Sequence, residues 1–422
     1  MLFIVYLLKN LFFLIFRITF STFQRLYHVT NLKKNIAQIV MILFVGHFIC
    51  LGQDLNRVIT TGVPFLLIAP DARAAGMGDL GVATPADVYS QQWNPAKYAF
   101  ISSEKVLGFS YTPYLSKLVD DIFLGNITYF TRINERSSWA TSLKYFSLGD
   151  IQFNEFIGGS IIDQGLERPT ELTLDLSYAL KLSKTFSMAV AGRYIRSDLK
   201  IVTDADTSSA NSLGVDITGF YKSNVFELGT NNAIFRSGFN ISNIGPRLIY
   251  DIGDQKNFIP TNFKTGLGLD LLFDSNNILG IYTEFNKLLV PTPIAVYDQN
   301  NIFIKYCQPD VDFLKGIFTS FNDAPGGVSE ELKEITFALG LEYRFQDSFS
   351  IRSGFFGENQ DKGSRRYLTM GAGFDLKSVD IDISYLFSIS NVRNPLENTI
   401  RFSIAIDIGN SVSISKTDIP EE

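Results

Sequence analysis

The 422-residue chain carries 37 basic and 43 acidic side chains, and its net charge of −6 leaves no basic surplus for binding nucleic acid. Hydrophobic residues make up 46% of the sequence, yet no run beyond residue 52 reaches the roughly 20 apolar residues that a transmembrane helix needs, which excludes a multi-helix membrane protein. The 37 Phe, 18 Tyr and 32 Gly favour strands and tight turns, so we expect an all-β chain.

Residues 1–52 have the composition of a targeting region. A basic pair at 33–34 precedes the apolar run 36–51, and Gly52 follows as a small residue of the kind that signal peptidase reads. We expect a secretory signal cleaved near Gly52; the alternative, a membrane anchor, is disfavoured because the run is shorter than a usual span. A further apolar stretch, 2–20, precedes this signal and suggests a start site assigned too far upstream.

Histidine and cysteine usage restricts the chemistry of the mature chain. His28, His47 and Cys50 all precede the expected cleavage point, which leaves Cys307 alone. An internal disulfide, a nucleophile activated by histidine, a zinc site with histidine ligands and a histidine general base are all excluded. We therefore expect no enzymatic activity, no cofactor and no metal site.

Residues 53–104 fit neither the strand period nor a simple helix. Their central part, 64–100, reads PFLLIAPDARAAGMGDLGVATPADVYSQQWNPAKYAF. Its glycines permit close approach to a wall, and Asn94-Pro95 starts a turn or caps a short helix, so a segment that plugs a barrel lumen is expected. The residues of this motif are Asp71, Arg73, Gly76, Met77, Gly78, Asp79, Trp93, Asn94 and Pro95.

The charged residues of this plug segment need partners. Asp71, Arg73 and Asp79 are expected to pair with Arg193, Glu342 or Arg344 of the lumen wall, and the sequence leaves open which pairs form.

Beyond residue 104 the chain alternates apolar and polar residues with the period of a strand. In 336–345, for example, Phe337, Leu339 and Leu341 share one face and Glu342 lies on the other. This pattern predicts about fourteen strands, an even number, as in bacterial outer-membrane barrels. They are expected near 105–115, 120–133, 137–148, 170–182, 185–199, 210–223, 233–244, 261–273, 278–289, 334–345, 348–358, 366–377, 378–389 and 398–408.

The connections between these strands alternate between short turns and long loops. The long ones are 149–169, 200–209, 245–260, 290–333 and 390–397. Only the short outer loop near 116–119 and the longer inner connection 224–232 depart from the rule. Short turns belong to the periplasm and long loops to the outside, so we expect 53–104 and the tail 409–422 in the periplasm and a transmembrane barrel over 105–408. A soluble β-sandwich would have shorter strands.

The plug motif resembles the N-terminal region of the FadL-like outer-membrane barrels. Within that group, residues 69–79 and 93–98 are similar to the PorV family of the type IX secretion system of Bacteroidetes. The resemblance implies a fourteen-stranded barrel that binds the C-terminal signal domain of secreted proteins, associates with a very large translocon barrel and transfers cargo to a sortase-like attachment complex.

Two functions remain open: a secretion component and a transporter of hydrophobic small molecules. A secretion component would bind cargo or partners through apolar side chains on its long loops. The alternative is that these loops form a lid over one another. The candidate residues are Phe153, Phe156, Ile157, Tyr297, Phe303, Tyr306, Phe313 and Phe318.

The rival function is passage of hydrophobic small molecules, as in FadL-like transporters, which requires an apolar lumen. The inward faces of the expected strands instead carry many charged residues, among them Asp175, Arg193, Glu342, Arg344 and Arg401. The sequence therefore favours the secretion component.

Overall fold

The computed structural model describes residues 57–157, 160–199, 209–250, 256–274, 276–300, 303–346, 348–390 and 394–409. All of them belong to one compact unit, Leu55–Glu422. The expected signal region, its cleavage point and all but the first residue of the expected tail lie outside the described residues.

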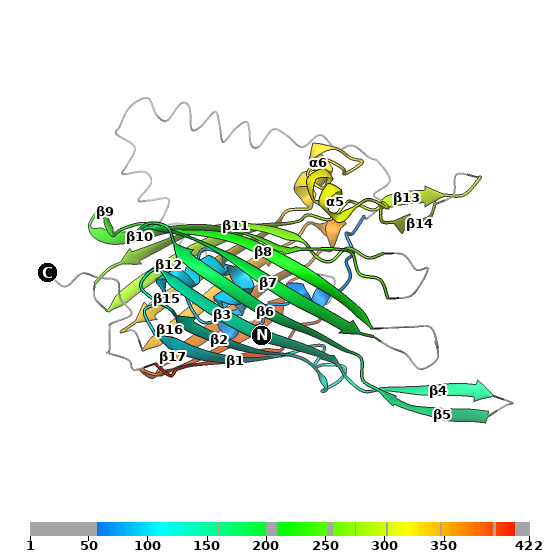
Figure 1. The fold of residues 1–422 in the computed structure, drawn as a ribbon, viewed down its shortest axis with the longest axis horizontal. Coiled ribbons are helices and arrows are strands. Elements are labelled where there is room, and N and C mark those ends of the chain that lie inside the picture. The colour runs from blue at the N-terminus through cyan, green and yellow to red at the C-terminus, as the bar shows by residue number, and fades with distance from the viewer. Residues whose placement is uncertain are drawn as a thin grey trace, which may run out of the picture. The chain divides into compact units, whose positions relative to one another are not determined.

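Fourteen antiparallel strands form a closed barrel (Figure 1). The first strand, β1, pairs with the last, β19, so the sheet has no open edge and its backbone amides are satisfied within the wall. The expected fourteen-stranded barrel is confirmed. Its strands are β1 (Lys105–Pro113), β2 (Ile122–Arg132), β3 (Ser137–Leu148), β6 (Thr170–Lys181), β7 (Phe186–Asp198), β8 (Ala210–Lys222), β10 (Asn231–Ile244), β11 (Asn262–Leu272), β12 (Asn277–Leu288), β15 (Thr336–Phe345), β16 (Phe349–Gly357), β17 (Arg366–Asp375), β18 (Val379–Ser388) and β19 (Ile400–Asp407).

The two faces of the wall have opposite character. On β6, Leu174 and Leu176 are 51% and 59% exposed on the outside, whereas Asp175 between them is 1% exposed on the inside. The alternation places an apolar band on the outer surface and polar side chains in the lumen, as in barrels that cross a bilayer.

The connections alternate in length as expected, but two of the long ones carry structure of their own. Connection 149–169 forms a hairpin of β4 (Ile151–Ile157) and β5 (Ser160–Glu167). Connection 289–335 forms a second hairpin of β13 (Ile294–Tyr297) and β14 (Phe303–Cys307), followed by helices α5 (Phe313–Thr319) and α6 (Val328–Lys333). The remaining short elements outside the lumen are β9 (Phe226–Leu228) and η3 (Gln360–Lys362).

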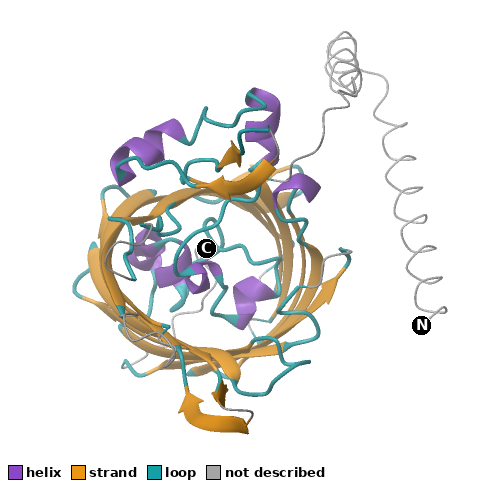
Figure 2. Ribbon diagram, turned by 90° about the vertical axis from the view of Figure 1, so that its right-hand side faces the viewer, coloured by secondary structure: helices purple, strands orange, loops and turns teal. Residues whose placement is uncertain are grey.

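The segment before β1 fills the lumen. It forms η1 (Pro64–Leu67), α3 (Ala72–Ala75), α4 (Ser90–Trp93) and η2 (Pro95–Phe100), which lie inside the ring of strands in Figure 2. α3 contacts β17, β18 and β19, while η2 contacts β3, β6, β7 and β8 on the other side. The expected plug is therefore present. Among the described helices, none is long and apolar enough to span a membrane.

The plug runs through the whole length of the lumen. Its C-terminal end leads into β1 at the end of the barrel where the short turns lie. Its N-terminal end lies at the opposite end, where Arg57 is 2.9 Å from Glu330 of α6. Residues 57–62 therefore lie at the end of the barrel opposite to the start of β1 and the end of β19, and the expectation that all of 53–104 lies at the short-turn end is wrong for them. The segment crosses the barrel instead of folding back on itself.

Candidate functional site

A seam of glycines brings the plug against the wall. A Cβ atom at Gly354 of β16 would lie 2.1 Å from the backbone nitrogen of Gly78, and one at Gly340 of β15 would lie 2.8 Å from Met77. Gly78 itself has a φ of +82°, which L side chains rarely adopt. The Gly-Met-Gly motif and its partner glycines thus let two backbones meet without an intervening side chain.

Asp71 organises the first helix of the plug. Its carboxylate accepts hydrogen bonds from the Ala74 backbone N–H at 2.8 Å and from Trp93 Nε1 at 2.7 Å. The first bond caps α3, and the second ties that helix to α4. The ammonium of Lys264, on β11, lies 4.6 Å from the Trp93 ring centroid, a cation–π contact. Asp71 and Trp93 therefore hold the plug together instead of facing a ligand.

Asn94 and Glu284 attach the second half of the plug. The Asn94 side chain caps η2 through the Ala96 N–H and donates to the carbonyl oxygens of Val82 and Gly219 at 3.1 and 3.0 Å. Glu284 of β12 accepts the N–H groups of Gly81 and Val82, both at 2.9 Å. In the sequence, an inward-facing position on a strand is the only feature that marks Glu284, and many other residues share it.

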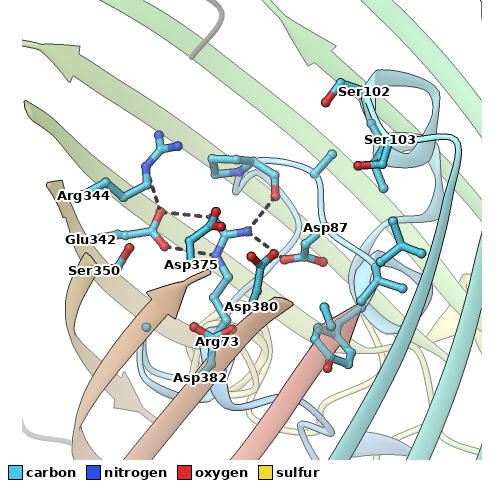
Figure 3. A pocket seen from close by; sticks show the side chains of 18 of the residues that line it. Arg73, Asp87, Ser102, Ser103, Glu342, Arg344, Ser350, Asp375, Asp380 and Asp382 are labelled. Atoms are coloured by element: carbon cyan, nitrogen blue, oxygen red, sulfur yellow. Dashed lines mark hydrogen bonds and ion pairs between the residues drawn. The ribbon is translucent and has the colours of Figure 1, made fainter. Parts of the chain in front are cut away.

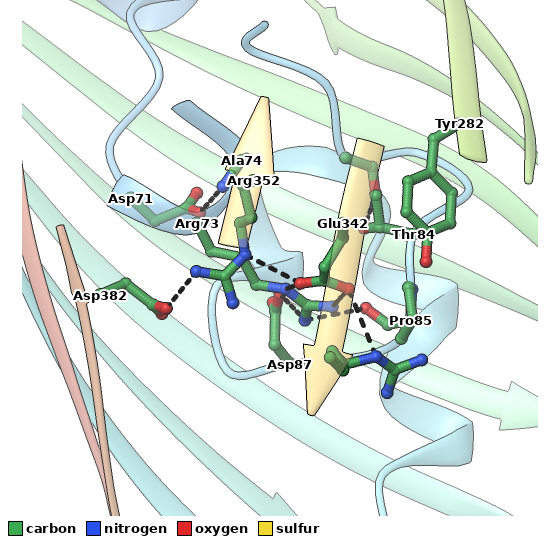
Figure 4. A network of polar contacts seen from close by, with 12 residues as sticks. Asp71, Arg73, Ala74, Thr84, Pro85, Asp87, Tyr282, Glu342, Arg352 and Asp382 are labelled. Atoms are coloured by element: carbon green, nitrogen blue, oxygen red, sulfur yellow. Dashed lines mark hydrogen bonds and ion pairs between the residues drawn. The ribbon is translucent and has the colours of Figure 1, made fainter. Parts of the chain in front are cut away.

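Arg73 connects the plug to a buried ion network (Figure 4). Its guanidinium donates to both oxygens of Glu342, at 3.0 and 3.1 Å, and to Asp87 at 2.9 Å. Arg352 bridges Glu342 at 2.8 Å and Asp382 at 2.6 Å. Glu342 is fully buried, so its charge is stable only because these arginines surround it.

The network continues along the wall. Arg344 lies 3.1 Å from Asp270, which also pairs with Arg236 and accepts the Tyr282 hydroxyl at 2.6 Å. Positive and negative groups are interspersed throughout, which gives a charged and largely compensated interior.

The expected ion pairs of the plug are confirmed only in part. Arg73 pairs with Glu342 as expected. Asp79 instead lies 2.7 Å from Arg401, and Asp71 has hydrogen-bond donors in place of an arginine. Arg193 pairs within the wall, with Asp175 at 2.5 Å and Asp216 at 3.1 Å.

Two buried plug residues have shifted acidities. Burial raises the pKa of the Asp71 carboxyl to about 6, with repulsion from Asp87 as the next cause. Burial also lowers the pKa of the Lys97 ammonium to about 8, although Lys97 donates to Gly81 O at 2.8 Å and Thr84 Oγ1 at 3.0 Å. Both charges depend on hydrogen bonds made within the folded plug.

A cavity of about 390 Å³ lies between the plug and the short-turn end of the barrel (Figure 3). Its lining includes Arg73, Asp87, Glu342 and Arg352 from the ion network, and Ser102 and Ser103 where the plug leads into β1. The lining combines these charged groups with apolar side chains such as Phe100, Phe220 and Ile234, so the cavity differs from the mostly apolar pockets that hold hydrocarbons. Among the residues described, no cluster of three or more His, Cys, Asp or Glu side chains is arranged to hold a metal ion.

The candidate loop residues divide by exposure. Phe156 of β4 and Phe318 of α5 are 73% and 77% exposed, and Tyr297 and Phe303 of the second hairpin are exposed too. Phe153, Tyr306 and Phe313 are half-buried; Ile157 lies in β4, and its side chain is outside what the structure describes. The loops therefore do not bury all of their apolar side chains in a common lid.

Comparison with solved structures supports the fold. The Pseudomonas putida toluene transporter TodX aligns over 82% of this chain and 100% of its own, with 12% identity and a TM-score of 0.50. The Ralstonia pickettii toluene transporter TbuX (13% identity, 81% and 98% coverage, TM-score 0.45) and a Pseudomonas aeruginosa FadL homologue (12%, 83% and 99%, 0.41) align less well. The similarity to TodX indicates a FadL-like barrel and says nothing of the ligand. No curated protein matches the chain.

The family is established by sequence. The model of the type IX secretion system protein PorV matches residues 52–295, which is more than half of the chain and includes the entire plug motif. The fold, with its plugged fourteen-stranded barrel and apolar outer band, is that of an outer-membrane protein. The chain therefore belongs to the PorV family of outer-membrane components of the type IX secretion system.

Proposed function

We propose that this barrel binds the C-terminal signal domain of secreted proteins at the large translocon barrel and transfers them to a sortase-like attachment complex on the cell surface. In this arrangement the short turns and the C-terminal tail face the periplasm, and the long loops face outward. Residues 1–52 act as the signal region, 53–104 as the plug and 105–408 as the barrel. Family membership supports the system, and the surface of the long loops supports the binding role.

The observation that carries the proposal is the β4–β5 hairpin, which extends away from the barrel in Figure 1. Phe156 and its cross-strand partner Ile161 are 73% and 74% exposed, and Leu166 is 67% exposed. A two-stranded hairpin on its own is only marginally stable in water, and these side chains gain from a partner that covers them. Its free edges also offer backbone groups to an incoming strand.

The β13–β14 hairpin adds a second apolar patch. The Phe303 ring packs 6.2 Å from Tyr297 and 4.8 Å from Tyr306, measured between centroids. Aromatic side chains of this kind are typical of the energetic centre of protein interfaces, because they bury a large area at a small entropic cost. We include this aromatic cluster in the proposed cargo surface.

The rival function, passage of hydrophobic small molecules, is less well supported. The plug crosses the lumen, and the cavity beside it is lined by Arg73, Glu342 and Arg352. Moving an apolar molecule past these charges would disrupt a compensated ion network.

The proposal is tested by co-purification from detergent-solubilised outer membranes, with captured chains identified by mass spectrometry. The unaltered protein is expected to recover a very large barrel and secreted proteins that share a C-terminal domain. The double variant F156S/I161S is expected to fold normally and to lose the secreted proteins. The matched control is L118S, which alters an equally exposed apolar residue (75%) in the connection between β1 and β2 and should retain them.

Undiminished capture by F156S/I161S would overturn the assignment of the hairpin. Recovery of the barrel alone with bound hydrocarbon or lipid would instead favour the transport function.

A further inference from the structure

Helices α5 and α6 present apolar stripes that no other described element covers. Leu314 and Phe318 lie one turn apart on α5 and are 49% and 77% exposed; Phe321, 51% exposed, extends the same stripe just beyond the helix. On α6, Val328 and Leu332 lie four residues apart and are 69% and 63% exposed. Side chains at these spacings share one face, so each short helix is amphipathic.

α6 is attached to the outer side of the barrel wall. Glu284 of β12 faces the lumen, and the strand alternation therefore directs Lys287 outward. The Lys287 ammonium lies 2.8 Å from Glu331 and 2.7 Å from Glu334, which occupy the polar side of α6. In Figures 1 and 2 the helices lie beyond the wall and outside the ring of strands.

This attachment point lies at the edge of the lipid-facing band. The next outward position on β12 is Phe285, which is 43% exposed and packs 5.3 Å from the ring of Phe337 on β15. Leu339 and Leu341 continue the exposed apolar surface along β15. Two residues of a strand span roughly 7 Å, so α6 begins where the aromatic edge of the band ends.

We propose that the apolar stripes of α5 and α6 insert into the boundary between headgroups and acyl chains of the adjacent membrane leaflet. We identify lipid as the occupant because α6 is attached to β12 two residues from Phe285, at the edge of a band that acyl chains cover. Amphipathic helices bind at this depth with the apolar face buried and the polar face in the headgroups. Connection 289–335 is thus fixed to the wall by Lys287 and to the membrane by Phe318 and Leu332.

The proposal is tested by spin labels in the full-length chain with Cys50 and Cys307 replaced by serine. One label is placed by F318C on α5, one by L341C in the lipid-facing band, and one by F156C on the projecting hairpin. Each protein is reconstituted into phosphatidylethanolamine–phosphatidylglycerol vesicles, and correct folding is checked by the heat-dependent gel shift of a barrel. Collision rates are then measured with oxygen, which concentrates in lipid, and with a water-soluble nickel complex.

The label at 318 is expected to match the one at 341, with high oxygen and low nickel collision rates. The label at 156 is expected to show the reverse. A label at 318 that is as accessible to nickel as the one at 156 would overturn the lipid anchor. Protection of 318 that arises only on addition of the translocon barrel would also overturn it, because the stripe would then be a protein interface.

Discussion

Glu342 balances the charge of the arginines around it inside the barrel. We expect E342Q to leave Arg73 and Arg352 without their shared carboxylate in a buried site, at a cost of about 3–5 kcal/mol. The midpoint of urea unfolding in detergent, followed by tryptophan fluorescence, should fall accordingly. E135Q, in the exposed β2–β3 turn, is the control and should leave the midpoint unchanged. Equal midpoints for both variants would contradict the structural importance of the network.

Gly354 makes the closest approach between wall and plug. In G354A the new Cβ would meet the backbone of Met77 and Gly78 at 2.1 Å, and neither backbone can rotate away. We expect a destabilisation larger than the roughly 1–3 kcal/mol typical of overpacking, with faster protease cleavage within the plug. G192A is the matched control on β7, where a Cβ would meet nothing within 4 Å. Equal cleavage rates in the two variants would show that the plug tolerates displacement.

For single residues, the sequence indicated which charged side chains of the plug need partners better than it indicated which partners they contact. It identified Arg73, Asp71 and Asp79 as charges that need partners, and Glu342 as one partner. It did not predict that Asp71 would accept from Trp93, or that Asp79 would meet Arg401 of the last strand. These contacts depend on how deep the irregular plug sits in the ring, and no periodic pattern encodes that depth.

Among the elements, α6 is attached to strand β12 by Lys287 and to the loop at η3 by Lys362. K287M removes the cation that Glu331 and Glu334 share, although Lys362 still pairs with Glu334. We expect protease cleavage within 289–335 to accelerate while the barrel keeps its heat-dependent gel shift. The matched control is K305M, on the exposed strand β14. If both variants were cut at the rate of the unaltered protein, Lys287 would not be what fixes the helix.

The wall strands could be predicted because each one faces lipid on one side and a polar lumen on the other. That contrast imposes an alternation of apolar and polar residues with a period of two, so the strand at 336–345 could be predicted from its sequence. The β4–β5 and β13–β14 hairpins were predicted as loops. They have no buried side to impose alternation, so their strand character follows from local pairing alone.

For the whole molecule, the plug determines whether the barrel conducts. The unaltered protein is expected to show no stable ion conductance in planar bilayers, because residues 63–100 occupy the lumen. Deletion of 57–100 should produce open channels, since the inward faces that remain are polar. Replacement of 151–167 by a Gly-Ser linker is the control and should stay silent. Conductance in the unaltered protein would mean that an open path passes the plug.

The position of residues 57–62 could not be predicted from the sequence. The lengths of the connections correctly placed the start of β1 and the end of β19 at the same end of the barrel. These lengths carry no information on a segment that precedes the first strand and connects no two strands of the wall. Its path became evident only from contacts such as Arg57 with Glu330.

The plug's contacts with the last strand have a consequence for assembly. The Ala72 N–H donates to Ser403 Oγ at 2.7 Å, and Asp79 pairs with Arg401, so β19 completes sites on a segment that is synthesised before any strand. β19 also closes the ring by pairing with β1. The plug, which precedes every strand in the chain, thus becomes the innermost layer of the barrel. Pairing of β19 with β1 gains the additional contacts of Ser403 and Arg401 only when the plug is in place. The plug therefore stabilises the closed ring as well as filling the lumen.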